Sequence, residues 1–424
     1  MPIAAHSIPA IYWLVLSSLG MLSHVAACTS GIDSSTRMGG TWLREAAGMQ
    51  QTSNLGVVSV RWRVPLFEGR SNVVRESSES DSRAGLGKSG VIDSDFPIET
   101  RRMGAPAMSR DGRRVFVGGL DGTLRCLDAE DGRTIWMKVS GGAFDSTPAI
   151  SNDLVAAGNS DGLIGAFRQT DGKTIWQHKV QGAFVGRPVF ASDRVFFMMG
   201  NDNLIALDIA SGDWKWAYKR DLPVGRFKVA GTGNPLVEKD RIYIGFADGS
   251  VALLSFADGN AITIKNLSQS GDRFTDVDTE PLIHNGTLIV ASFSTGVFGL
   301  DPATLDERWR FPLVGASSPA VSGSTLYVSD GESRVVALDV SSGKPHVLWV
   351  FKSEKGDLSR PVVAGRWLLV SSSVYSLIVL ERSSGRVAQV FNPGKGATSP
   401  PTVEGNRIFW VSNGETLYCL DIVP

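Results

Sequence analysis

Cysteine and histidine are scarce in this chain of 424 residues, which contains three cysteines and five histidines. No two cysteines form a Cys-x-x-Cys pair, and only three histidines lie beyond residue 27. This scarcity argues against a zinc or haem site. Cys126 and Cys419 occupy equivalent places in the stretches LRCLD and LYCLD. We therefore expect both to be small buried strand residues, with a disulfide between them as the alternative.

The chain also lacks an excess of charge of either sign. Its 42 Lys and Arg residues balance 43 Asp and Glu residues, so the formal net charge is −1. This balance gives no electrostatic case for binding nucleic acid. Long helical patterns are few, whereas glycine (47 residues) and tryptophan (11 residues) are frequent. With 42% hydrophobic residues the chain can bury a large core, and this composition is typical of all-β repeat proteins.

Residues 1–27 have the pattern of a signal peptide. The apolar run Ile8–Leu22 is too short for a comfortable membrane span, and it leads to the stretch VAAC, which ends at Cys28. Small residues before a cysteine are similar to a bacterial lipobox, in which the cysteine is lipidated and becomes the mature N-terminus. The alternative is an ordinary signal peptide in which Cys28 is incidental. Because Thr29 follows the cysteine, the resemblance implies sorting to the outer membrane, facing the periplasm, with residues 28–55 as a lipid-anchored tether.

A period of about 40 residues runs through the rest of the chain. A mostly polar residue, here called the marker, ends a β-like run at eight positions: Asp128, Arg168, Asp208, Ser255, Asp301, Asp339, Glu381 and Asp421. A proline begins each unit: Pro106, Pro148, Pro188, Pro235, Pro281, Pro319, Pro361 and Pro401. The distance from proline to marker is 20 residues in seven units and 22 in the first. A tryptophan follows the marker by eight residues in four units: Trp136, Trp176, Trp216 and Trp309.

Each unit contains three β-rich runs separated by turn residues and then a fourth run, which is typical of a four-stranded propeller blade. A blade cannot bury both faces alone, so we expect the tryptophan rings to pack between successive sheets. The eighth unit ends without an outer strand, and residues 56–66 (GVVSVRWRVPL) form an isolated β-like run. The sequence therefore predicts one all-β domain, residues 56–424, an eight-bladed propeller whose last blade is completed by the N-terminal strand.

Residues 67–100 lie between this N-terminal strand and blade one. They are rich in serine and charge and have no periodicity, so we expect a mobile insertion there. A regulatory or binding segment is the alternative.

Two connections between blades are unusually long. The marker intervals that end at Ser255 and Asp301 are 47 and 46 residues, and the extra residues precede Pro235 and Pro281. They lengthen the connections 219–234 and 265–280, which lead into blades four and five. Because these join consecutive blade pairs, we expect them side by side on one face. Long neighbouring loops on a rigid scaffold predict a binding surface there.

The second connection ends in the stretch TDVDTEP, which contains Asp276 and Asp278. Two residues apart in extended chain, their carboxylates would project to the same side. Neither connection offers a nucleophile, a histidine or a set of metal ligands beside them, so catalysis is not expected there. Two interpretations remain: a solvated turn whose aspartates bond local amides, and an acidic docking surface that meets basic residues of a partner.

The tandem units Asp121–Trp136 and Asp161–Trp176 are similar to the repeats of quinoprotein dehydrogenases and of the BamB family of outer-membrane assembly lipoproteins. The lipobox, the eight units and the stretch DVDTEP together resemble the BamB family more closely. Quinoprotein dehydrogenases typically place a vicinal disulfide against the cofactor, together with calcium ligands and a catalytic aspartate, and this chain has no adjacent cysteines.

The resemblance implies a non-enzymatic scaffold, without cofactor or metal, that aids insertion of β-barrel proteins into the outer membrane. In the BamB family the matching aspartates contact the periplasmic POTRA domains of the barrel subunit BamA, so the resemblance implies that role for Asp276 and Asp278. Nascent outer-membrane proteins are a further partner class, recognised by β-augmentation at a sheet edge or at the channel rim. A generic periplasmic propeller lipoprotein with another protein partner, and a quinoprotein dehydrogenase, are the alternatives.

The first connection matches the family less closely. The family has an apolar-x-apolar-Arg stretch at this place. Here Phe227 and Val229 fall at the two apolar positions, whereas Ala230 replaces the arginine. Arg226 or Lys228 could supply the positive charge from a neighbouring position, although alternation would direct each to another side.

Overall fold

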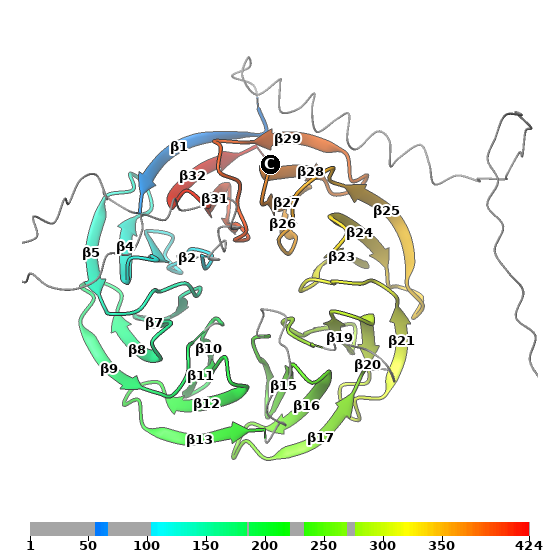
Figure 1. Ribbon diagram of the computed structural model, residues 1–424, viewed down its shortest axis with the longest axis horizontal. Coiled ribbons are helices and arrows are strands. Elements are labelled where there is room, and N and C mark those ends of the chain that lie inside the picture. The colour runs from blue at the N-terminus through cyan, green and yellow to red at the C-terminus, as the bar shows by residue number, and fades with distance from the viewer. Residues whose placement is uncertain (1–55, 67–102, 185, 221–232, 269–275, 424) are drawn as a thin grey trace, which may run out of the picture.

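A computed structural model describes residues 56–66, 103–184, 186–220, 233–268 and 276–423 of the chain. All regular elements of this part are β-strands, and they form eight four-stranded antiparallel sheets arranged in a ring around a central axis (Figure 1). The all-β, eight-bladed propeller is therefore confirmed. Within the described part of the chain, no helix is long and apolar enough to cross a membrane.

The first four blades are each contiguous in sequence. Within a blade, the first strand is innermost and the fourth is outermost. Blade one has the strands β2 (Ala107–Met108), β3 (Arg114–Gly118), β4 (Thr123–Asp128) and β5 (Thr134–Val139). Blade two has β6 (Ala149–Ser151), β7 (Leu154–Gly158), β8 (Leu163–Arg168) and β9 (Thr174–Lys179). Blade three has β10 (Val189–Ala191), β11 (Arg194–Met198), β12 (Asn203–Asp208) and β13 (Trp214–Lys219). Blade four has β14 (Leu236–Glu238), β15 (Arg241–Gly245), β16 (Ser250–Ser255) and β17 (Ala261–Asn266).

The next three blades repeat this order, and the eighth combines both ends of the domain. Blade five has β18 (Leu282–His284), β19 (Thr287–Ser292), β20 (Gly296–Leu300) and β21 (Glu307–Phe311). Blade six has β22 (Ala320–Ser322), β23 (Thr325–Ser329), β24 (Arg334–Asp339) and β25 (His346–Lys352). Blade seven has β26 (Val362–Ala364), β27 (Trp367–Ser372), β28 (Ser376–Glu381) and β29 (Val387–Phe391). Blade eight has β30 (Thr402–Glu404), β31 (Arg407–Val411), β32 (Thr416–Ile422) and β1 (Val58–Pro65).

The ring closes where strand β1 pairs antiparallel with β32, in the sheet order β1-β32-β31-β30. Gln389 of blade seven strengthens this closure: its side-chain oxygen accepts the Val58 N–H (2.7 Å), and its amide nitrogen donates to the Val58 carbonyl (3.1 Å). On the other side of the closing blade, Arg61 forms ion pairs with Asp421 and with Glu130 of blade one. The N-terminal strand therefore completes the last blade, as expected.

Tryptophan rings join neighbouring blades. The indole N–H of Trp136 donates to the carbonyl of Gln169 in the next blade (2.8 Å), and its ring lies against Gly172, where an added Cβ would come within 2.8 Å. Four other tryptophans donate the indole N–H in the same way, to the backbone carbonyl of the residue after the next marker. The pairs are Trp62 with Ala129, Trp176 with Ile209, Trp216 with Phe256 and Trp349 with Arg382. Gly172 has a φ of +70°, so this glycine supplies both the left-handed turn and the space for the ring.

The contact between blades four and five is built differently. In blade four, Thr263 occupies the position at which other blades have the interblade tryptophan. In blade five, Leu305 occupies the position at which other blades have the glycine that faces this ring. Leu305 adopts a φ of +61° and is fully buried. The hydroxyl of Tyr243 donates to the carbonyl of Pro302 (2.9 Å), which is the bond that an indole makes elsewhere. A leucine therefore replaces the missing ring volume, and a tyrosine replaces the missing donor.

Cys126 in β4 and Cys419 in β32 are free and fully buried. Burial raises the pKa of each thiol to about 12. Their expected role as small hydrophobic strand residues is confirmed, and the alternative of a disulfide is wrong. The signal peptide, Cys28, the tether and the 67–100 insertion lie outside the described residues.

Candidate binding face

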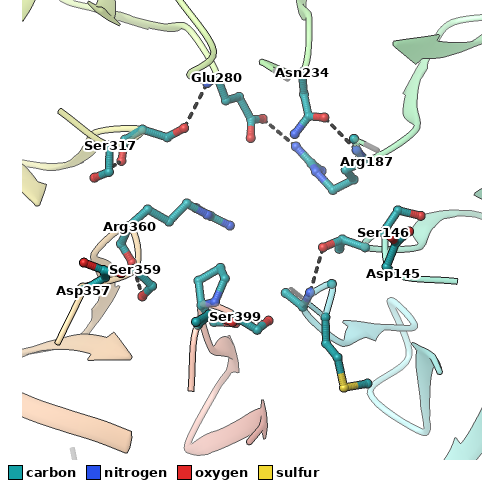
Figure 2. A pocket seen from close by; sticks show the side chains of 18 of the residues that line it. Asp145, Ser146, Arg187, Asn234, Glu280, Ser317, Asp357, Ser359, Arg360 and Ser399 are labelled. Atoms are coloured by element: carbon teal, nitrogen blue, oxygen red, sulfur yellow. Dashed lines mark hydrogen bonds and ion pairs between the residues drawn. The ribbon is translucent and has the colours of Figure 1, made fainter. Parts of the chain in front are cut away.

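The central channel opens on the face where the connections between blades reach the innermost strands. The residues that precede the eight repeat prolines all line one pocket at this opening, with a volume of about 620 Å³ (Figure 2). We call them the pre-proline ring: Ala105, Thr147, Arg187, Asn234, Glu280, Ser318, Arg360 and Pro400. The residue before a proline is restricted to extended conformations. The same backbone geometry therefore recurs eight times around the axis.

Small residues stand one position before the ring and let the blades approach closely. The hydroxyl of Ser146 donates to the carbonyl of Gly158 (2.9 Å), and that of Thr279 donates to the carbonyl of Ala291 (2.8 Å). These bonds tie the starts of blades two and five to their own second strands, β7 and β19. The pre-proline ring is therefore held in place by the fold itself.

The described ends of the two long connections lie side by side on this face. Gly233, at the end of the first connection, is so close to the second that an added Cβ would come within 2.5 Å of the Thr279 carbonyl oxygen. Both connections lead to the channel, because Asn234 and Glu280 belong to the pre-proline ring. This arrangement agrees with the expectation that two enlarged neighbouring connections share one face.

A turn of blade four, residues 246–249, anchors both connections. Arg220, which begins the first connection, forms an ion pair with Asp248 (2.7 Å) and lies over the ring of Phe246 (5.1 Å to the centroid). Val277, near the end of the second connection, donates its N–H to the carbonyl of Phe246 (3.0 Å). The turn 246–249 therefore holds the start of the first connection and the end of the second.

The two candidate aspartates differ in exposure. Asp276 is only 1% exposed, whereas Asp278 is half-buried. Both make interactions within the protein, and the Asp276 carbonyl accepts the N–H of Phe293 (2.9 Å). Val277 between them belongs to the core shared by blades four and five. Of the two carboxylates, only that of Asp278 is in a position to meet a partner directly.

The four candidate residues of the first connection, Arg226, Phe227, Lys228 and Val229, lie outside the described residues. The structure therefore gives no placement for the apolar and basic parts of the expected docking surface.

Sequence reasoning missed three charged residues at the channel: Arg187, Glu280 and Arg360. Arg187 forms an ion pair with Glu280, and its backbone N–H donates to the side-chain oxygen of Asn234 (2.7 Å). The backbone N–H of Glu280 in turn donates to the hydroxyl of Ser318 (3.0 Å). These bonds connect blades three to six. Their position immediately before a repeat proline is the signal that could have identified all three.

Arg360 reaches into the channel from blade seven (Figure 2). It remains exposed to the water of the channel, and its guanidinium has no hydrogen bond or ion pair with any residue that the structure describes. Enclosure by the channel wall lowers the pKa of Arg360, Glu280 raises it, and Arg187 lowers it further. Among the described residues, no three His, Cys, Asp or Glu side chains gather in a way that could hold a metal ion.

The sequence matches a family model described as "Outer membrane protein assembly factor BamB" over residues 59–179, 121–349 and 345–423. BamB of Shewanella oneidensis is 26% identical over 304 residues, which cover 70% of this chain and 66% of that protein. BamB of Yersinia pestis is 24% identical over 318 residues, covering 73% of this chain and 70% of that protein. BamB of Escherichia coli K12 is 27% identical over 207 residues, 47% of this chain and 52% of its own length.

Solved structures share the fold. The crystal structure of BamB from Moraxella catarrhalis superposes with a TM-score of 0.67 at 19% identity, covering 77% of this chain and 98% of that one. A europium-containing methanol dehydrogenase reaches a TM-score of 0.66 at 12% identity, covering 87% and 94%. At these identities the likeness concerns the propeller architecture alone. The family model, by contrast, spans all eight blades, and the chain belongs to the BamB family of outer-membrane protein assembly factors.

Proposed function

We propose that this protein is a non-enzymatic scaffold for the assembly of β-barrel proteins into the outer membrane. The observation that carries the proposal is the match of the family model from residue 59 to residue 423, which includes every blade. The named relatives are outer-membrane protein assembly factors. The likeness to a methanol dehydrogenase concerns the fold only, and the sequence lacks the adjacent cysteines that the quinoprotein enzymes typically use.

The partner in this proposal is the barrel subunit BamA, bound through its POTRA domains on the face of blades three to five. Three features support this face: the adjoining ends of both long connections, their common anchor at residues 246–249, and the half-buried Asp278 at the rim. Asp278 would meet a basic residue of the partner, because a charge at an interface rim steers and orients docking. Asp276, which is buried, would hold the connection in shape rather than touch the partner.

The first connection would complete the surface. Phe227 and Val229 would contribute apolar contact area, and Arg226 or Lys228 would contribute positive charge. Apolar anchors beside charged groups are the usual composition of an interface hot spot. Nascent barrel strands remain a second class of partner for the same assembly role.

Replacing Asp278 with lysine is expected to reduce co-purification with BamA from detergent-solubilised membranes at least tenfold, since an attractive rim contact becomes repulsive. The matched control is Asp153→Lys, which makes the same charge change on an exposed turn between β6 and β7, at the opposite face. Circular dichroism should show that both variants keep the fold.

Undiminished co-purification of the Asp278→Lys protein would remove this site from the proposal. A crosslinked pull-down of the unaltered protein that contains no barrel-assembly component would instead favour a propeller lipoprotein with another partner.

The proposal also places the protein at the periplasmic side of the outer membrane through a lipid on Cys28. Cys28→Ala is expected to abolish incorporation of labelled palmitate and to release the protein from the membrane fraction, because a mature chain without acyl groups has no anchor. Cys126→Ala is the control, since this thiol is fully buried in β4. Palmitate labelling that persists in the Cys28→Ala protein would contradict the anchor.

A further inference from the structure

Two arginines and one glutamate provide the charge of the pre-proline ring. Arg187 of blade three and Arg360 of blade seven point toward each other across the channel, and Glu280 reaches in from blade five (Figure 2). The other five ring members are uncharged: Ala105, Thr147, Asn234, Ser318 and Pro400. The ring therefore carries a formal charge of +1, with two positive groups and one negative group.

The two arginines are not equivalent. Arg187 is held by its ion pair with Glu280 and by Asn234, whereas no described residue pairs with the guanidinium of Arg360. A guanidinium stays protonated in proteins, so the positive charge of Arg360 persists inside the channel. Its side chain is exposed to the water of the channel, so it is accessible to an anion that enters from solvent.

The other described acids that line the pocket form no ion pair with Arg360. Asp145 makes an interaction of its own within the protein, and Asp357 is directed away from the centre of the pocket (Figure 2). The charged groups that act on Arg360 are Glu280 and Arg187. The guanidinium of Arg360 is therefore not paired with any described acid that lines the pocket.

We propose that the pre-proline ring binds one carboxylate, held between the guanidinium groups of Arg360 and Arg187. A guanidinium presents a planar fork of donors that matches a carboxylate with two parallel hydrogen bonds. A polyanion fits less well, because its additional charge would be repelled by Glu280. The pocket volume of about 620 Å³ accommodates a glutamate-sized group.

A carboxylate at this site can come from two kinds of molecule. It is either an acidic side chain of a protein docked on this face or a free organic acid. The first source rests on the proposed function, since the ends of both long connections contribute Asn234 and Glu280 to the pocket. The site itself rests only on the residues of the ring.

Binding is measured by saturation-transfer NMR on the mature chain at low salt, with N-acetylglutamate amide as the probe. N-acetylglutamine amide is the matched neutral ligand. We expect the acid to bind at least tenfold more tightly than the amide, and Arg360→Gln to reduce its affinity at least tenfold. Arg133→Gln removes an exposed arginine outside the channel and is expected to leave the affinity within twofold. Equal binding of the two ligands, or unchanged binding by Arg360→Gln, overturns the proposal.

Two further measurements separate the alternatives. The thermal midpoint of Arg360→Gln should match that of the unaltered protein, because the guanidinium has no partner to lose among the described residues. If Arg360→Gln also lowers co-purification with BamA, the carboxylate belongs to the docked protein; if co-purification is unchanged, it belongs to a free acid. If the unaltered protein retains BamA but does not bind the glutamate probe, the carboxylate site is refuted and the docking proposal stays intact.

Discussion

A chain that begins at residue 67, and so lacks strand β1, is expected to be largely unfolded at 37 °C. Strand β1 makes seven paired positions with β32. Its segment also places Val58 (4% exposed) and Leu66 (1% exposed) in the core, together with the partly buried Trp62 and Val64. Burial of four such side chains contributes about 6–8 kcal/mol. This is comparable with the whole free energy of unfolding of a typical domain, about 5–15 kcal/mol.

The control is a chain that begins at residue 56 and therefore retains β1. Thermal unfolding followed by circular dichroism should give this chain the midpoint of the full protein, while the chain from residue 67 shows no cooperative transition. A synthetic peptide of residues 56–66 should restore the transition, because it supplies the missing strand in trans. If the two truncated chains unfold at the same temperature, the ring does not depend on β1 for its closure.

The blade count and the closing strand could be predicted because each rests on a local signal that recurs at a constant distance. The proline marks the start of the innermost strand, and the marker lies where the third strand ends, as with Asp128 in β4 and Asp208 in β12. The contact between blades four and five could not be predicted in the same way. The sequence shows Thr263 and Leu305 as exceptions. It does not show that Tyr243, from another strand of blade four, reaches the Pro302 carbonyl.

The candidate site, too, was predicted from the sequence only in part. The face and the adjacency of the two connections followed from the marker intervals. The difference between Asp276 and Asp278 did not, because alternation of exposure holds for a regular strand, and residues 276–280 precede β18. This segment lies between two neighbouring turns and forms backbone hydrogen bonds with both: Val277 donates to Phe246, and Asp276 accepts from Phe293. The neighbours, rather than the period of the chain, decide which carboxylate is buried.

The tryptophan contacts between blades predict a second large effect, in strand β13, which contains two tryptophans with opposite surroundings. Trp216 donates to the carbonyl of Phe256 (3.1 Å), lies 5.7 Å from the ring of Phe196 and fills the space over Gly259 in blade four. Trp214, two residues earlier, is 51% exposed. Trp216→Ala is expected to lower the free energy of unfolding by about 3–5 kcal/mol, because it opens a cavity between two sheets.

Trp214→Ala is the matched control, since it removes the same side chain from the same strand. Its effect should stay within about 1 kcal/mol, because half of that ring already contacts water. Denaturant unfolding measures both variants under identical conditions. Gly259→Ala provides an independent check: its methyl group would come 2.5 Å from the Trp216 ring at a backbone φ of +73°. A loss comparable to that of Trp216→Ala is therefore expected. Equal stability of the two tryptophan variants would mean that the indole between the blades does not hold the sheets together.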